Sequence, residues 1–70
     1  MKVKDLSNKI GGATKGFVEI KRGNEKLTQT TFKTLCHDQS SIWEFLGMTV
    51  NFFNIEITQK GDIYMTVQVK

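Results

Sequence analysis

The sequence contains no proline and a single cysteine, Cys36, among its 70 residues. One cysteine excludes an intramolecular disulfide, and without proline any strand at a sheet edge lacks that form of protection. A chain this short buries only about 60% of the surface that its unfolded form exposes. We therefore expect one small domain, residues 1–70, in a reducing compartment, and self-association would add to its stability.

Long apolar runs are absent as well. The most apolar stretch, residues 42–57, is interrupted by polar residues and glycine: Glu44, Gly47, Thr49, Asn51, Asn54 and Glu56. A helix needs about 20 apolar residues to cross a bilayer, and a secretory signal needs an apolar core that does not follow the first residues here. The sequence predicts a soluble cytoplasmic protein that does not contact a membrane.

Charge of one sign is in only slight excess, with 10 Lys and Arg against 7 Asp and Glu. Nucleic-acid-binding modules usually carry a larger or more clustered excess. The one tight basic pair, Lys21-Arg22, has Glu19 and Glu25 close by. Nucleic-acid binding is therefore the alternative function rather than the first one. It would use five basic residues: Lys15, Lys21, Arg22, Lys26 and Lys33.

Residue patterns typical of catalysis and metal binding are missing too. Cys36 and His37 are neighbours, but a closed zinc site needs four ligands at recognisable spacing, and adjacency alone does not bring an imidazole to a thiol. The segment 11–16 lacks the order of glycine, lysine and hydroxyl residues of a phosphate-binding loop. The carboxylates are scattered along the chain. We expect no enzymatic activity, no cofactor and no metal site.

The last third of the chain, in contrast, alternates between apolar and polar residues over 53–58 and 62–69, with Tyr64 at a polar position. This pattern predicts two strands of a hairpin, each with its apolar side chains on one face. A two-residue loop would mix the two faces, whereas a three-residue loop, 59–61, keeps them apart and places Gly61 where a left-handed residue is needed. The resulting register pairs Thr58 with Asp62, Ile57 with Ile63, Ile55 with Met65, and Phe53 with Val67.

Upstream, the patterns predict a first hairpin and two short helices. Strands at 17–21 and 26–32 flank a Gly23-Asn24 turn; a two-residue loop sets Ile20 opposite Leu27, but the match beyond is poor, so this register stays open. One helix follows the stripe Val3, Leu6 and Ile10 and ends at Gly11-Gly12, before a loop over 13–16. The other begins with Ser41 and Glu44 as a capping box, buries Ile42, Phe45 and Leu46, and ends at Gly47.

The order α-β-β-α-β-β predicts an α+β fold in two layers, with a four-stranded antiparallel sheet and two short helices on one face. The alternative is a β-grasp-like sheet, because β-β-α-β-β is also that fold's order of elements. The alternation breaks at Phe52-Phe53. Either a bulge lies there or the third strand starts only at Phe53.

Aromatic residues provide the candidate contact surface. Phe45 and Phe53 fit the predicted core, but four others lie off its pattern: Phe17, Trp43, Phe52 and Tyr64. Exposed aromatic side chains and an unprotected strand edge are typical of protein contacts. We therefore predict a non-enzymatic, accessory or regulatory protein-binding module, with a homodimer as one form of the contact.

Three segments give a resemblance to a known group of proteins. They are the opening Lys2-Val3-Lys4-Asp5-Leu6, the strand Phe17-Val18-Glu19-Ile20, and the closing strands with Ile55-Glu56-Ile57 and Ile63-Tyr64-Met65-Thr66-Val67. In these the chain resembles small uncharacterised proteins of prophages and conjugative elements in low-GC Gram-positive bacteria. The resemblance implies a mobile-element origin, a cytoplasmic setting and a host or phage protein as partner.

Overall fold

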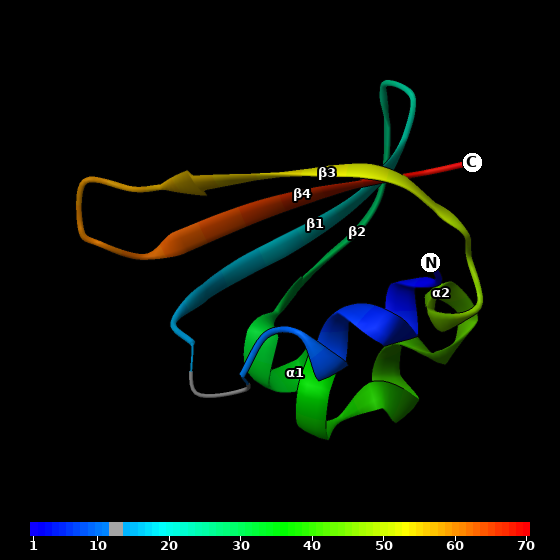
Figure 1. Cartoon of the computed structure of the whole chain (residues 1–70), viewed down its shortest axis with the longest axis horizontal. Coiled ribbons are helices and arrows are strands. Elements are labelled where there is room, and N and C mark those ends of the chain that lie inside the picture. Colours follow the sequence, from blue (N-terminus) through cyan, green and yellow to red (C-terminus); the bar gives the residue numbers. More distant parts are fainter. Residues whose placement is uncertain (12–13) are drawn as a thin grey trace.

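The computed structural model describes residues 1–11 and 14–70, which form a sheet with short helices on one of its faces (Figure 1). The elements along the chain are the 3-10 helix η1 (Val3–Asn8), β1 (Gly16–Arg22), β2 (Glu25–Thr31), α1 (Phe32–His37), the 3-10 helix η2 (Gln39–Ile42), α2 (Trp43–Leu46), β3 (Val50–Ile57) and β4 (Ile63–Val69). The first helix was expected to run to Gly11-Gly12, but it is a 3-10 helix that already ends at Asn8. Gly12 and the start of the loop expected over 13–16 lie outside the described residues. None of the helices in the described part is long and apolar enough to cross a membrane.

The sheet is mixed, so the prediction of a purely antiparallel sheet was wrong, although the α+β class is confirmed. Its strand order is β2-β1-β4-β3. The hairpins β1–β2 and β3–β4 are antiparallel, but the central pair β1–β4 is parallel. Sequence alternation specifies how strands pair within each hairpin, whereas the long helical connection decides how the two hairpins join. A connection of that length permits a parallel pair.

The register of the second hairpin is confirmed. Ile57 lies opposite Ile63, Ile55 opposite Met65 and Phe53 opposite Val67. The backbone N–H of Thr58 donates to the carbonyl oxygen of Asp62 at 2.8 Å, and Gly61 has a φ of +87°. The loop length therefore sets the register, as expected for a three-residue loop with a left-handed glycine.

The break in alternation before this hairpin is a bulge. The pairing of β3 with β4 shifts between Val50 and Phe52, so that Asn51 is the extra residue. Val50 consequently faces the helices and is buried, whereas Phe52 faces the opposite side of the sheet. The strand therefore starts at Val50 rather than at Phe53.

The first hairpin also contains an irregularity, which explains why its register could not be read from a simple alignment. Arg22 pairs with Glu25 around the Gly23-Asn24 turn, but the register then shifts and Ile20 lies opposite Thr28. The alignment of Ile20 with Leu27 is therefore not formed. One extra residue in β2 restores the facing of β1 toward the core.

The starts of two helices in the helical layer differ from the predictions. Thr31 caps α1 by accepting a hydrogen bond from the backbone N–H of Thr34 at 3.1 Å, and the helix that follows was not predicted. The predicted capping box at Ser41 and Glu44 is wrong, because Ser41 lies inside η2 and its hydroxyl donates to the carbonyl of Asp38 at 3.0 Å. The single helix expected there is two short ones, η2 and α2.

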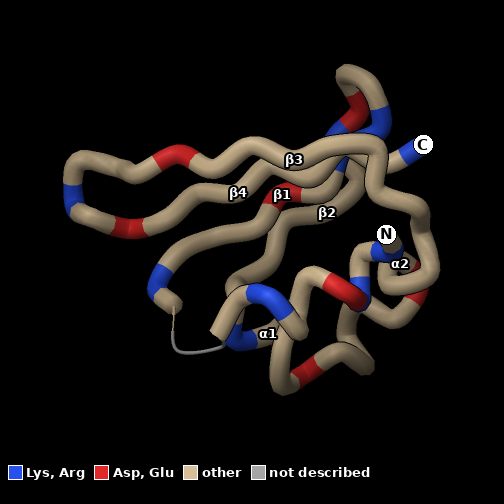
Figure 2. The backbone as a smooth tube through the Cα atoms, in the orientation of Figure 1, with Lys and Arg blue, Asp and Glu red and all other residues tan. Residues whose placement is uncertain are grey.

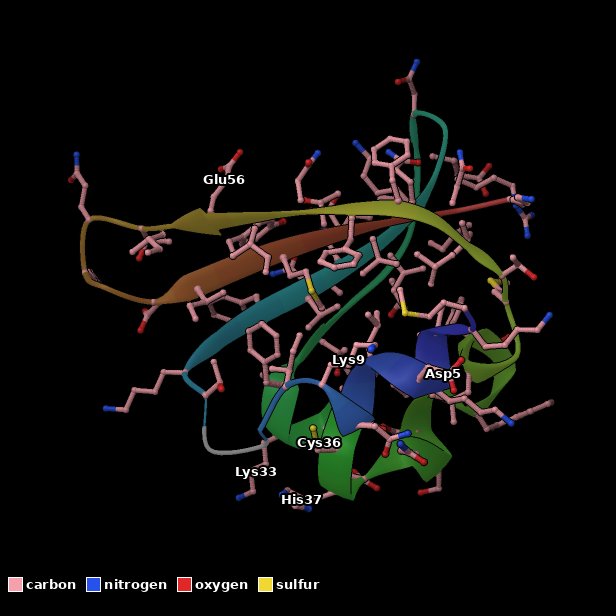
Figure 3. The ribbon with its side chains drawn as sticks, viewed as in Figure 1. Asp5, Lys9, Lys33, Cys36, His37 and Glu56 are labelled. Carbon is pink, nitrogen blue, oxygen red and sulfur yellow. The ribbon has the colours of Figure 1, made fainter. Side chains whose placement is uncertain are left out.

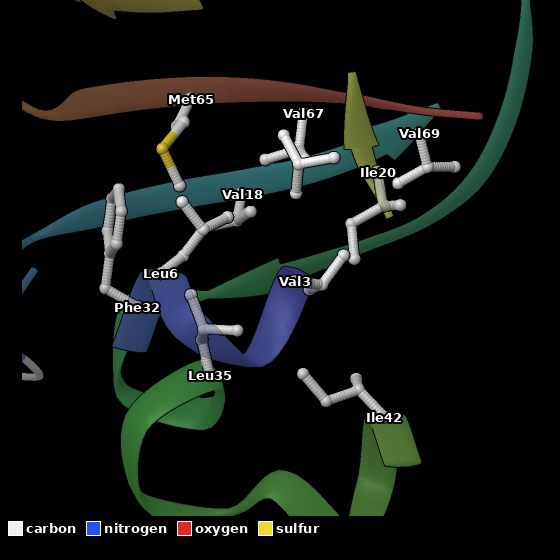
Figure 4. Close-up of a cluster of buried hydrophobic side chains, with 11 residues drawn as sticks. Val3, Leu6, Val18, Ile20, Phe32, Leu35, Ile42, Met65, Val67 and Val69 are labelled. Atoms are coloured by element: carbon white, nitrogen blue, oxygen red, sulfur yellow. The ribbon is translucent and has the colours of Figure 1, made fainter. Parts of the chain in front are cut away.

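The core lies between this layer and the two central strands (Figure 4). Its buried side chains come from every element except β2 and α2: Val3, Leu6, Val18, Ile20, Phe32, Leu35, Ile42, Val50, Met65, Val67 and Val69. Burial of Val3 and Leu6 confirms the N-terminal stripe. Among the described residues, Val50 is the sole buried contribution of β3, and the prediction that Phe53 belongs to the core was wrong, since 39% of it is exposed.

Candidate protein-binding edge at strand β3

The apolar face of β3 points to the helical side of the sheet but is not covered there. Phe53, Ile55 and Ile57 are 39%, 53% and 74% exposed, whereas their neighbours Met65 and Val67 on β4 are fully buried. Helix α1 packs on β1 and β2. Strand β3 is the outermost strand of the sheet, and Figure 1 shows that the turn end of the β3–β4 hairpin also projects beyond the helices. An apolar row of this kind marks a contact surface.

The backbone of the same residues is also unpaired on one side. In an antiparallel pair, residues alternate between those that bond across the pair and those whose N–H and C=O point away from it. Because Thr58 bonds to Asp62, the alternation directs the N–H and C=O groups of Phe53, Ile55 and Ile57 away from β4. Since β3 is the last strand of the sheet, these groups point outward. We call the stretch Phe53–Ile57 the β3 edge.

The upstream end of the same strand is closed by the N-terminal residues. The N–H of Val50 donates to the carbonyl of Met1 at 2.7 Å, and the N–H of Val3 donates to that of Met48 at 3.0 Å. Lys2 and Thr49 form the bridge between these two bonds. The edge is therefore covered up to the bulge and is open only beyond it.

Natural sheets usually protect an open edge with proline, lysine, a further bulge or a covering loop. From Phe53 to Ile57 the strand contains neither proline nor lysine, and its one charged residue is Glu56. Figure 3 shows the Glu56 side chain on the face away from the helices, so it does not interrupt the apolar row. Over the described residues, 1–11 and 14–70, no other segment pairs with this edge.

The four aromatic residues predicted as a contact surface do not gather in one place. Phe17 lies beside Tyr64 in the parallel β1–β4 pair, while Phe52 lies opposite Gln68, toward the other end of β4. Trp43 belongs to α2 in the helical layer and is 73% exposed. Phe17 and Phe52 are 43% and 52% exposed. Of the four, Phe52 directly precedes the β3 edge on the same strand, and Tyr64 lies opposite Glu56 on β4.

Tyr64 is tied down rather than free. Its hydroxyl donates to the carboxylate of Glu19 on the neighbouring strand. This hydrogen bond, followed by burial and by the negative charges of Glu19 and Glu56, raises the pKa of Tyr64 above its ordinary value of 10.0. We infer that Tyr64 helps to hold β4 to β1 on the outer face of the sheet.

The Tyr64–Glu19 bond predicts a change of stability at high pH. The folded state keeps the proton of Tyr64 at pH values where the unfolded chain loses it, so the free energy of unfolding should fall as pH rises above about 10. Tyr64→Phe should lower that free energy by about 0.5–1 kcal/mol near neutral pH and flatten its decline above pH 10. Urea unfolding at several pH values measures both effects. Glu19→Gln should flatten the decline too; an unchanged slope in both variants would contradict the bond's role.

The five basic residues predicted as nucleic-acid contacts fall into two groups on the chain drawn in Figure 2. Lys21, Arg22 and Lys26 meet at the tip of the first hairpin, where Lys21 lies opposite Lys26. Lys15 precedes the start of β1 and Lys33 lies in α1, near the opposite end of these strands. The structure therefore brings together three of the five residues considered for nucleic-acid contact.

Cys36 and His37 are neighbours on α1, but their side chains have different surroundings (Figure 3). The half-buried Cys36 thiol donates to the carbonyl oxygens of Ile10 at 3.2 Å and Ser7 at 3.8 Å, which links α1 to the N-terminal segment, while His37 is exposed. Within the described residues no three His, Cys, Asp or Glu side chains form a metal-binding group, and no pocket is present.

Comparisons of the chain with protein-family models, with curated proteins and with solved structures give no match. The candidate site is therefore defined by geometry. Sequence reasoning missed Phe53, Ile55 and Ile57 because alternation assigned them to the core. No local pattern could have found them, because β3 becomes the edge strand only through the pairing of β1 with β4.

Proposed function

We propose that the protein is a small, non-enzymatic protein-binding module that takes up an extended strand of its partner at the β3 edge. The observation that carries the proposal is the coincidence at Phe53, Ile55 and Ile57 of exposed apolar side chains with outward-pointing backbone groups. Strand addition uses both features, since the main chain supplies hydrogen bonds and alternate side chains supply specificity.

The chemistry of the partner follows from the edge. A strand added to β3 must place apolar side chains at every second position, on the helical side of the sheet, to cover Ile55 and its neighbours. Its other positions face the outer surface, where Asn54 and Glu56 lie, and polar or basic side chains fit there. Net hydrogen-bond gains of about 0.5–1.5 kcal/mol each add to the burial of the apolar row.

The finer features of the fold and setting are proposals as well. We propose a β-grasp-like fold, supported by two hairpins joined through a helical segment with the parallel β1–β4 pair at the centre. The phage or mobile-element origin rests on the resemblance of the sequence. A cytoplasmic location is supported by the free, half-buried Cys36 thiol.

The proposal predicts which substitution abolishes binding. A displayed library of eight-residue peptides should yield binders with alternating apolar residues, and Ile55→Lys should weaken them at least about tenfold, because lysine is the residue that natural sheets use to block an edge. Trp43→Lys is the matched control, since it adds the same charge at an exposed apolar side chain on α2. Titration followed by amide NMR shifts gives the affinities. Binders that ignore Ile55→Lys and are lost in Trp43→Lys would place the contact on the helices instead.

Nucleic-acid binding stays the second candidate because Lys21 and Lys26 face each other beside Arg22. Glu25 pairs with Arg22 at the same tip, which weakens the local positive field. A gel-shift titration with DNA and RNA at low salt separates the two functions. Retardation that disappears in a Lys21→Ser, Lys26→Ser double variant would support this candidate, and no retardation would remove it.

A further inference from the structure

We propose that the strand that occupies the β3 edge is β3 of a second copy of this chain, so that two copies form one continuous sheet about a twofold axis. The inference rests on the open edge of the proposed function and adds the identity of the partner. Three independent features point to it: the symmetry of the edge's backbone groups, the position of its one charge, and the place where the N-terminal residues close it.

The backbone groups of the edge are arranged symmetrically about Ile55. The outward-pointing residues are Phe53, Ile55 and Ile57, at equal spacing along the strand. An antiparallel twofold contact centred on Ile55 places it opposite Ile55 of the second copy, and Phe53 opposite Ile57 of the second copy. Every outward N–H and C=O then finds a partner, which gives about six hydrogen bonds between the copies. A twofold contact also closes on itself, so the β3 edges of both copies are used and neither is left for a third copy.

The negative charge of Glu56 favours the register centred on Ile55 over the register centred on Glu56. A shift that centres the contact on Glu56 would set the two Glu56 carboxylates opposite each other, and like charges directly opposite across a strand pair are destabilising. With Ile55 at the centre, Glu56 lies opposite Asn54 of the second copy instead. The amide of Asn54 can donate to that carboxylate.

The covered end of β3 argues against the neighbouring register in the other direction. Centring the contact on Asn54 would bring Ile57 of the second copy opposite Asn51, the bulged residue, next to the Met1 carbonyl that bonds to Val50. With Ile55 at the centre, the ladder spans Phe53–Ile57 of both copies and ends before the bulge on each side. The length of the open edge and the length of the symmetric ladder are thus the same.

The contact also covers the exposed apolar row. Within each copy Ile55 lies beside Met65, so the contact lines up four apolar side chains across the axis, with the two Ile55 side chains at the centre. Phe53 packs beside Ile57 of the second copy on the same helical side. Both helical layers lie on that same side, because an axis perpendicular to the sheet keeps the faces together. An interface made by one strand pair falls in the small class, below about 1,200 Å² in total, which predicts a dissociation constant in roughly the micromolar range.

Sedimentation equilibrium of the full chain over a range of concentrations tests the pairing. The wild type and Trp43→Lys should both dimerise, whereas Ile55→Lys should stay monomeric at the highest concentration, with circular dichroism showing that it is folded. A wild type that is monomeric throughout, while library peptides still bind the edge, would overturn the second copy as occupant and leave the proposed function standing. Dimerisation that survives Ile55→Lys would place the contact between copies elsewhere.

Single cysteines test the register in a Cys36→Ser background. Hydrogen-bonded antiparallel residues have Cα atoms about 5.5 Å apart, within the range for a disulfide. Ile55→Cys should therefore cross-link to itself under mild oxidation. Phe53→Cys and Ile57→Cys should each fail alone, because their own copies lie about four residues apart along the strands, yet cross-link to each other when mixed. Self-cross-linking at residue 53 or 57 with none at 55, or no cross-linking in any variant that still dimerises, would overturn the proposed register.

Discussion

Replacing Gly16 by alanine should lower the free energy of unfolding by about 3 kcal/mol or more, a large part of the roughly 4–10 kcal/mol expected for a chain of this length. Gly16 has a φ of +147°, which side-chain-bearing residues rarely adopt. A Cβ atom there would lie 1.8 Å from the carbonyl oxygen of Ile63. That oxygen belongs to the backbone of the adjacent strand β4, so it cannot swing aside as a flexible side chain would.

The position matters because it is where the two hairpins join. Gly16 is paired with Ile63 at the start of the parallel β1–β4 ladder, and the N–H of Ile63 donates to the carbonyl of Lys15 at 3.0 Å. Relief of the clash requires the strands to separate at this point, which loosens the pair that holds the core.

Gly47→Ala is the control for the Gly16 variant. Gly47 has a φ of −85°, and a Cβ added there meets no atom within 4 Å. The free energy of unfolding of Gly47→Ala should differ from that of the wild type by less than about 1 kcal/mol. A small increase is expected because alanine makes the unfolded chain less flexible. Urea unfolding followed by circular dichroism compares the two variants. Equal midpoints for Gly16→Ala and Gly47→Ala would mean that β1 and β4 do not approach as closely as the structure shows.

The sequence predicts the local pairing in this fold well. The second hairpin could be read residue by residue, because apolar alternation and a glycine-ended loop act on neighbouring residues and agree with each other. The bulge at Asn51 is visible in the sequence as well, as a break in the alternation. Val50 and Phe53 are three residues apart and would face opposite sides of a regular strand, yet both face the helices. The first hairpin resisted the same treatment because its extra residue lies within a threonine-rich strand, where no apolar pattern marks it.

Arrangement over longer distances was not predictable in the same way. Nothing in the two hairpins specifies that β4 lies beside β1, and the parallel pair depends on how the connecting helices pack. The candidate site was missed for a related reason. Alternation shows that Ile55 and Met65 share a face, but not that helices cover Met65 and stop short of Ile55. Of the aromatic residues singled out from the sequence, Phe52 lies on the strand that carries the site.

The difference between a covered and an uncovered apolar face predicts a large contrast between two identical substitutions. Phe32 lies at the start of α1, is fully buried, and reaches toward the sheet from below (Figure 4). Phe32→Ala should lower the free energy of unfolding by about 3–5 kcal/mol, because it removes a buried ring and leaves a cavity. This loss is enough to unfold much of the population of so small a domain.

Phe53→Ala is the matched control, because it removes the same atoms from a side chain that is 39% exposed. Its loss should be about 1 kcal/mol, since part of the ring already contacts water and no enclosed cavity is left. Urea unfolding should be measured at low protein concentration, so that association between copies does not add to the stability of the wild type. Phe32→Leu, which keeps more of the ring's volume, should lose less than Phe32→Ala and give a measurable transition if the alanine variant unfolds. Equal losses for Phe32→Ala and Phe53→Ala would mean that the helical layer extends over β3, and the edge would then not be open to a partner.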